Sequence, residues 1–176
     1  ICSYNIEFPE FKVNEGYSFA VLKLNDRIRN FIEEKAKFCS NYNVGSLSLT
    51  YEIKYTDKNK LSLIFTKELK ISDKEKNVEF YAFNFDLETG QEINLQDLLL
   101  NNKTVKINEL IIDQIKTKQK SSNLFELDKF DLFDENFKNS YIYYFADRSI
   151  ILRFNPEKIT NGIPEAIEIL IPKKFL

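Results

Sequence analysis

The chain has 176 residues, of which 43% are hydrophobic and 30% are charged, and its formal net charge is −2. These values are ordinary for a single globular domain, and they argue against a nucleic-acid-binding protein, which usually carries a basic face. No apolar run reaches the ~18 residues that a transmembrane helix needs.

Histidine is absent, and the chain has two cysteines and four glycines. Histidine therefore cannot activate a serine or cysteine nucleophile, and two cysteines alone cannot form a structural zinc site. The glycines form no phosphate-binding motif. We therefore expect no enzyme, no metal and no cofactor; catalysis would have to use carboxylates, lysine, tyrosine or a bound cofactor.

The first predicted element is a short strand over residues 1–8, which Pro9 ends. A helix is predicted over residues 17–39, because apolar residues recur there at intervals of three and four. Asn14 or Ser18 is expected to cap its start.

The two cysteines, Cys2 and Cys39, lie in this strand and at the end of this helix. The sequence begins at Ile1 and lacks methionine, which is typical of a processed product of an exported protein. We therefore expect a disulfide between Cys2 and Cys39. Two free thiols, or a lipid attached to Cys2, are the alternatives.

Three strands follow, with the alternation of apolar and polar residues that is typical of a sheet with one buried face. They span residues 47–55, 61–69 and 78–87, and the polar residues 57–60 connect the first two as a hairpin with one buried face. In the first strand, the apolar residues share one face: Leu47, Leu49, Tyr51, Ile53 and Tyr55.

A tight turn is predicted directly after these strands. Asp86 and Thr89 are expected to bond to the backbone of the turn, and Gly90 to adopt a positive φ. Asp97 would stabilise the start of the next helix, where the helix dipole favours a carboxylate. A catalytic pair of Asp86 and Asp97 for sugar hydrolysis is the alternative, but it requires a set separation that the sequence does not define.

Two helices are predicted next, a short one over residues 94–101 with Asn94 as its cap and a longer one over 104–118 with Thr104 as its cap. The segment 121–139 could contain a short helix lined by Phe130, Phe133 and Phe137. Its acidic residues could bind a cation or a basic partner, but we favour a solvated helix face; they are Glu126, Asp128, Asp131, Asp134 and Glu135.

The last three strands are predicted over residues 140–146, 149–155 and 166–171. Their tyrosines are candidates for stacking on sugars or for anchoring a protein interface: Tyr141, Tyr143 and Tyr144. Tyr141 and Tyr143 share one strand face and Tyr144 lies on the other, so one of the two faces must be core.

This order of elements predicts an α+β fold: a mainly antiparallel sheet of about six to seven strands, with two main helices packed on one face. We expect a single domain over residues 1–176, with 1–77 and 78–176 as its two parts if it is subdivided. We expect a monomer.

Four segments of the chain resemble the extracytoplasmic domain of RsiV-type anti-sigma factors, which also precedes the catalytic part of PdaC-type peptidoglycan deacetylases. They are IEFPEF (6–11), the pattern Leu24-Asn25 followed by Ile28, FDLETGQEINLQDL (85–98), and the closing segment 144–172. Relatives often carry a loop with Gly and His before the third segment, but TKELKISDKEKN (66–77) has neither.

The resemblance implies a non-catalytic binding or sensor domain of a bacterial cell-envelope protein, outside the cytoplasm and secreted or lipid-anchored. It implies a partner such as lysozyme or cell-wall glycan. An accessory domain of a peptidoglycan deacetylase, or a carboxylate-based glycan hydrolase, is the alternative.

Overall fold

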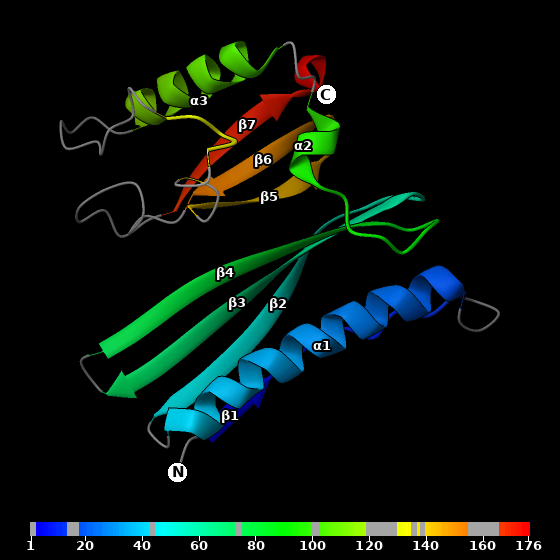
Figure 1. Ribbon diagram of the computed structural model, residues 1–176, viewed down its shortest axis with the longest axis vertical. Coiled ribbons are helices and arrows are strands. Elements are labelled where there is room, and N and C mark those ends of the chain that lie inside the picture. The colour runs from blue at the N-terminus through cyan, green and yellow to red at the C-terminus, as the bar shows by residue number, and fades with distance from the viewer. Residues whose placement is uncertain are drawn as a thin grey trace. The chain divides into compact units, whose positions relative to one another are not determined.

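The computed structural model (Figure 1) describes residues 3–13, 18–42, 45–72, 75–99, 103–118, 130–134, 137, 140–154 and 166–176. The chain separates into two compact units, Ile1–Glu92 and Ile93–Leu176. The division that we expected after residue 77 falls inside a strand of the first unit, and the boundary lies between Glu92 and Ile93 instead. That the two units form one domain stays a prediction.

The first unit is a four-stranded sheet with one long helix. Its elements are β1 (Ser3–Ile6), α1 (Phe19–Tyr42), β2 (Ser46–Thr56), β3 (Lys60–Ser72) and β4 (Glu75–Asp86). The strand order is β1-β2-β3-β4; β1 pairs with β2 in parallel, and the other pairs are antiparallel. Figure 1 shows α1 running along one face of this sheet.

The core of the first unit lies between α1 and the sheet. The apolar stripe of α1 meets the alternating apolar positions of β2, β3 and β4, as the sequence pattern predicts. The cluster comprises Leu24, Ile28, Phe31, Ile32, Leu49, Leu61, Leu63, Phe65, Phe83 and Phe85.

The second unit is a three-stranded antiparallel sheet with one main helix. Its elements are α2 (Leu95–Leu98), α3 (Thr104–Lys118), β5 (Tyr141–Ala146), β6 (Ser149–Phe154), β7 (Ile167–Pro172) and the 3-10 helix η3 (Lys173–Phe175). The inner side of α3 is fully buried at Ile107, Ile111 and Ile115. Every second residue of β6 is buried as well: Ile150, Leu152 and Phe154.

Side chains of α3 cover the free edge of β7. The Gln114 amide donates to the Leu170 carbonyl (3.0 Å) and accepts from the Leu170 N–H (3.3 Å), and Lys118 donates to the Glu168 carbonyl. Because unpaired edge groups invite pairing with other chains, these bonds protect this edge.

The predicted α+β class, the number of strands and the two main helices are confirmed. The strands are divided between two sheets, however, where we expected one sheet with both helices on one face. Short turns determine the pairing of consecutive strands, but two helices separate β4 from β5, so no local signal indicates whether these two strands pair.

Two local expectations differ from the structure. Asn94 precedes α2, but its side chain makes no capping hydrogen bond. The described part of segment 121–139 consists of turns instead of the expected helix around Phe130 and Phe137. The Asp131 carboxylate accepts from the Phe133 N–H (3.1 Å) and so competes with helical hydrogen bonding.

Candidate functional site

The turn after β4 is built around the carboxylate of Asp86. Its Oδ1 accepts from the N–H of Glu88 (2.9 Å), the N–H of Thr89 (2.8 Å) and the hydroxyl of Thr89 (3.1 Å). The Gly90 N–H donates to the Asp86 carbonyl (2.8 Å), and Gly90 has a φ of 69°. The bond from the Thr89 N–H is the largest cause that lowers the pKa of Asp86, whereas a general acid for sugar hydrolysis needs a raised pKa.

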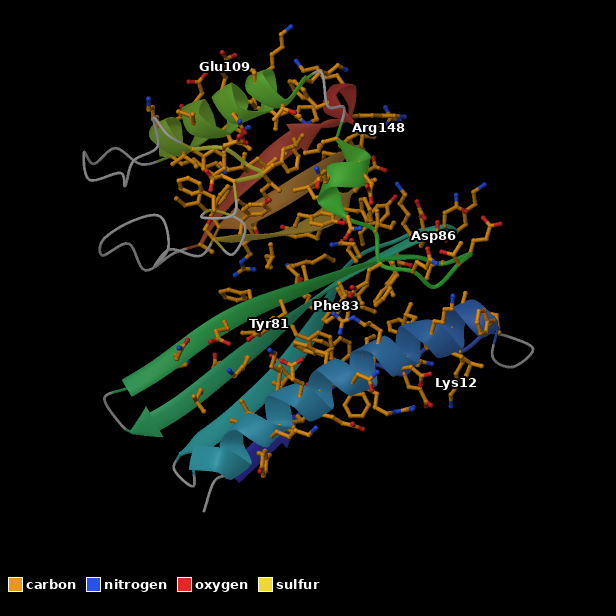
Figure 2. All side chains as sticks on the ribbon, in the orientation of Figure 1. Lys12, Tyr81, Phe83, Asp86, Glu109 and Arg148 are labelled. Carbon is orange, nitrogen blue, oxygen red and sulfur yellow. The ribbon has the colours of Figure 1, made fainter. Side chains whose placement is uncertain are left out.

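This turn rests on the first turn of α1. A Cβ at Gly90 would lie 2.2 Å from the carbonyl oxygen of Ala20, so only glycine permits the contact. About two helical turns further along α1, Arg27 forms an ion pair with Glu92 (3.1 Å) and lies 4.9 Å above the Phe83 ring. Figure 2 shows Asp86 at the end of the sheet, with Phe83 further inside.

Asn25 attaches the segment after β1 to the same part of α1. Its Nδ2 donates to the Phe11 carbonyl (2.8 Å), and its Oδ1 accepts from the Phe11 N–H (2.9 Å). Asn25 is buried, with 8% of its surface exposed. The start of α1 is capped by Ser18, whose hydroxyl accepts from the Val21 N–H (3.2 Å).

Asp97 lies in the first turn of α2, in the second unit, where its carboxylate accepts from the Asn94 amide (3.2 Å). Asp86 belongs to the first unit. The two carboxylates of the alternative catalytic pair, Asp86 and Asp97, are therefore not held within one unit.

The hydroxyls of Tyr141 and Tyr143 hold other segments of the second unit to β5. Tyr141 donates to the Leu132 carbonyl (2.8 Å), and Tyr143 donates to the Ile93 carbonyl. Burial, and then the nearby charge of Asp131, raise the pKa of Tyr141 to about 12. These two hydroxyls are therefore engaged within the protein.

Tyr144 lies on the opposite face of β5 and is buried. Its hydroxyl donates to the carboxylate of Glu168 on β7 (2.9 Å), and Arg153 on β6 lies 3.9 Å from the same carboxylate. The three tyrosines thus have internal hydrogen bonds and do not form one exposed aromatic surface.

Sequence reasoning missed a polar cluster beside the core of the first unit. Lys67, which is 6% exposed, pairs with the carboxylate of Glu79 (3.0 Å), and the same carboxylate accepts from the Tyr81 hydroxyl. The ammonium of Lys35 on α1 lies 4.6 Å above the Tyr81 ring. One sequence signal could have indicated this cluster: Lys67 occupies a position of β3 where the alternation calls for an apolar residue. It lies on the buried face, directly opposite Glu79 on β4.

Opposing effects set the pKa values in this cluster. Burial acts to raise the pKa of Glu79, but the hydrogen bonds from Tyr81 and Lys67 outweigh it, so the pKa is lowered. Burial, and then the Glu79 carboxylate, raise the pKa of Tyr81. Glu79 therefore stays ionised beside the Lys67 ammonium.

No group of three or more His, Cys, Asp or Glu side chains that could hold a metal ion occurs within the described ranges. Glu126, Asp128 and Glu135 of the acidic segment lie outside those ranges, as does Cys2, and nothing is described of the Cys39 side chain. The disulfide therefore stays a prediction. None of the described helices is long and apolar enough to cross a membrane.

On both strands, exposed apolar side chains follow the last pair of the β1–β2 ladder. The parallel ladder ends at the pair Ile6 and Leu49. Phe8 and Tyr51 each follow two residues later and are 51% and 37% exposed, and Ile53, two residues beyond Tyr51, is 46% exposed. We name Phe8, Tyr51 and Ile53 the β2-edge patch.

The Tyr51 ring lies 6.1 Å from the buried Phe65 ring, so the core supports the patch. Exposed apolar groups of this kind are typical of interaction sites. The β2-edge patch is therefore the candidate binding surface of the first unit, and sequence alternation had assigned Tyr51 and Ile53 to the buried face.

No known family model matches the sequence, and no curated protein matches it. The fold is similar to crystal structures of two DUF3298-family proteins. For the protein from Bacteroides fragilis the TM-score is 0.58 at 16% identity, over 88% of this chain and 62% of that chain. For the protein from Pseudomonas aeruginosa the TM-score is 0.54 at 14% identity, over 75% of this chain and 60% of that chain.

At these identities the likeness shows the fold alone, and the chain spans less than two thirds of either neighbour. The fold thus fits a domain family of unknown function.

Proposed function

We propose that the chain is a non-catalytic binding or sensor domain of a bacterial cell-envelope protein, located outside the cytoplasm. Its partner would be a protein such as lysozyme or a glycan of the cell wall. The observation that carries this proposal is the β2-edge patch, which presents two aromatic rings and one aliphatic side chain to solvent. The resemblance to RsiV-type and PdaC-type domains supplies the envelope setting.

The patch suits either partner class. Aromatic side chains give a large contact area at a low cost in conformational entropy, and they are enriched at protein interfaces. The same rings can stack on the apolar faces of sugars. Since Phe65 supports Tyr51 from below, little ordering would be needed on binding.

A non-catalytic role is supported by the state of the candidate carboxylate. Asp86 accepts three hydrogen bonds within its own turn and has a lowered pKa, which are the properties of a structural aspartate. Asp97 accepts from the neighbouring Asn94.

Binding of hen lysozyme and of soluble peptidoglycan fragments to the full chain would be measured by calorimetry. We expect one of the two to bind, and Phe8→Ser and Tyr51→Ser each to weaken that binding about tenfold, as for residues at the centre of an interface. Val105→Ser is the matched control, because Val105 is 71% exposed on α3 of the second unit.

Binding of neither ligand, or equal weakening by the control, would refute the proposal. Release of a hydrolysis or deacetylation product from the peptidoglycan fragments would refute its non-catalytic part. Binding of peptidoglycan fragments without lysozyme would favour an accessory domain of a peptidoglycan-modifying enzyme.

A further inference from the structure

One end of the second unit brings together basic residues from three segments that are distant in sequence. The Lys173 N–H donates to the Arg148 carbonyl (3.0 Å), which joins η3 to the turn between β5 and β6. Lys103, at the start of α3, donates to the Lys174 carbonyl. Figure 1 shows η3 beside the β5–β6 end of the sheet, and Figure 2 shows Arg148 there.

We name this surface the basic end. It is defined by Lys103, Lys106, Arg148, Lys173 and Lys174.

The charges of the basic end are available to an outside partner. Lys106, Arg148, Lys173 and Lys174 are exposed, and within the described residues no carboxylate forms an ion pair with them. The Lys174 ammonium lies 5.2 Å above the ring of Phe175.

Acidic residues of the second unit offset only part of this charge. Asp147 precedes Arg148, Asp97 lies on α2, and Glu109 lies one turn beyond Lys106 on α3. Among the described residues, the five basic residues of the basic end thus stand against these three acidic ones, whereas the whole chain has a formal net charge of −2.

An exposed apolar residue lies among these cations. Val105 is 71% exposed in the first turn of α3; Lys106 follows it in the same turn, and Lys103 directly precedes the helix. An apolar side chain flanked by lysines is the pattern of surfaces that rest on a lipid bilayer, where the apolar group enters the interface and the cations contact headgroups.

We infer that the basic end docks on the surface of an anionic phospholipid bilayer through the phosphates of its headgroups. Its charged groups come from three exposed segments, so they can contact several phosphates at once. Val105 adds apolar contact that a soluble anion could not use. This inference does not depend on the ligand of the β2-edge patch, which belongs to the other unit.

The test is co-sedimentation of the full chain with phosphatidylglycerol-containing vesicles and with pure phosphatidylcholine vesicles, at low and high salt. We expect binding to the anionic vesicles that high salt weakens. Each lysine near an anionic surface contributes about fivefold to binding, so Lys173→Gln combined with Lys174→Gln should weaken it about 25-fold. Val105→Ser should weaken it further.

The matched control is Lys37→Gln combined with Lys58→Gln, which removes two exposed charges from the first unit. Circular dichroism would verify that each variant is folded. Equal losses in the control and test variants would mean that only net charge matters, and this would overturn the inference. So would equal binding to neutral vesicles, or binding to soluble polyphosphate that is as tight and does not depend on Val105.

Discussion

Replacing Gly90 with alanine tests how the turn after β4 is held against α1. An L-residue at a positive φ costs about 1–2 kcal/mol. The added Cβ would also lie 2.2 Å from the carbonyl oxygen, 2.7 Å from the Cα and 2.8 Å from the carbonyl carbon of Ala20. These are backbone atoms of a helix, so the first turn of α1 or the whole β4 turn must move.

Forced displacement of packed groups costs about 1–3 kcal/mol. Together with the conformational cost, Gly90→Ala should therefore lower the free energy of unfolding by about 2–5 kcal/mol. Urea unfolding followed by circular dichroism would show this as a midpoint lower by roughly 1–2 M.

Gly45 provides the matched control, because it also has a positive φ, 87°, in the same unit. Gly45→Ala carries the conformational cost without the contact to Ala20. If Gly90→Ala costs no more than Gly45→Ala, the argument from the close approach is refuted. Rescue of Gly90→Ala by Ala20→Gly would refute it as well, because the contact involves the backbone of Ala20 and not its side chain.

Three further predictions concern polar groups of the same unit, all measured by urea unfolding. Asn25→Ala leaves the N–H and carbonyl of Phe11 without their partner, and should cost about 2–4 kcal/mol; a cost below about 1 kcal/mol would contradict the two-bond arrangement. The turn lowers the pKa of Asp86 from 3.8, so its stabilisation is present above this pH and is lost as the pH falls through the lower folded-state pKa. Asp86→Asn should therefore be less sensitive to acid than the unaltered protein, and equal sensitivity would contradict the pKa shift. Glu79→Gln weakens the partner of the buried Lys67 ammonium and should cost about 1–3 kcal/mol, whereas Lys67→Met combined with Glu79→Leu should recover most of that loss. A double variant no more stable than Glu79→Gln would contradict this reasoning.

Local patterns predicted the elements well, because each pattern reports on neighbouring residues. The last hairpin was expected over 140–146 and 149–155, and the structure has Tyr141–Ala146 and Ser149–Phe154. In the turn at Asp57, the carboxylate accepts from the N–H groups of Asn59 and Lys60, both at 2.7 Å, which is ordinary turn chemistry.

Features that depend on distant contacts were not predictable in the same way. Alternation assigned Tyr51 and Ile53 to a buried face, and they do lie on the α1 side of β2. They are nonetheless exposed, and both lie beyond Leu49, where the β1–β2 ladder ends. Alternation thus indicates on which face of a strand a residue lies, but not whether another element covers that residue.

The basic end shows the same limit for charge. Nothing in the sequence around Arg148 or around Lys173 indicates that the two residues are neighbours. The hydrogen bond between their backbones brings them together. Net charge, from which we expect no nucleic-acid partner, carries no information on such a local concentration of basic residues.

The segments that carried the family resemblance explain why it indicates fold more securely than function. Asn25 and Phe11 belong to two of these segments and bond to each other, and Gly90 of a third packs on the first turn of α1. Their residue types are required by backbone contacts within the first unit, so they would be kept whatever the protein binds. Phe8 is different: it lies in the same segment as Phe11, but half of its surface faces solvent. A function shared with relatives would therefore depend on residues such as Phe8, and not on the turn or the helix that make the resemblance visible.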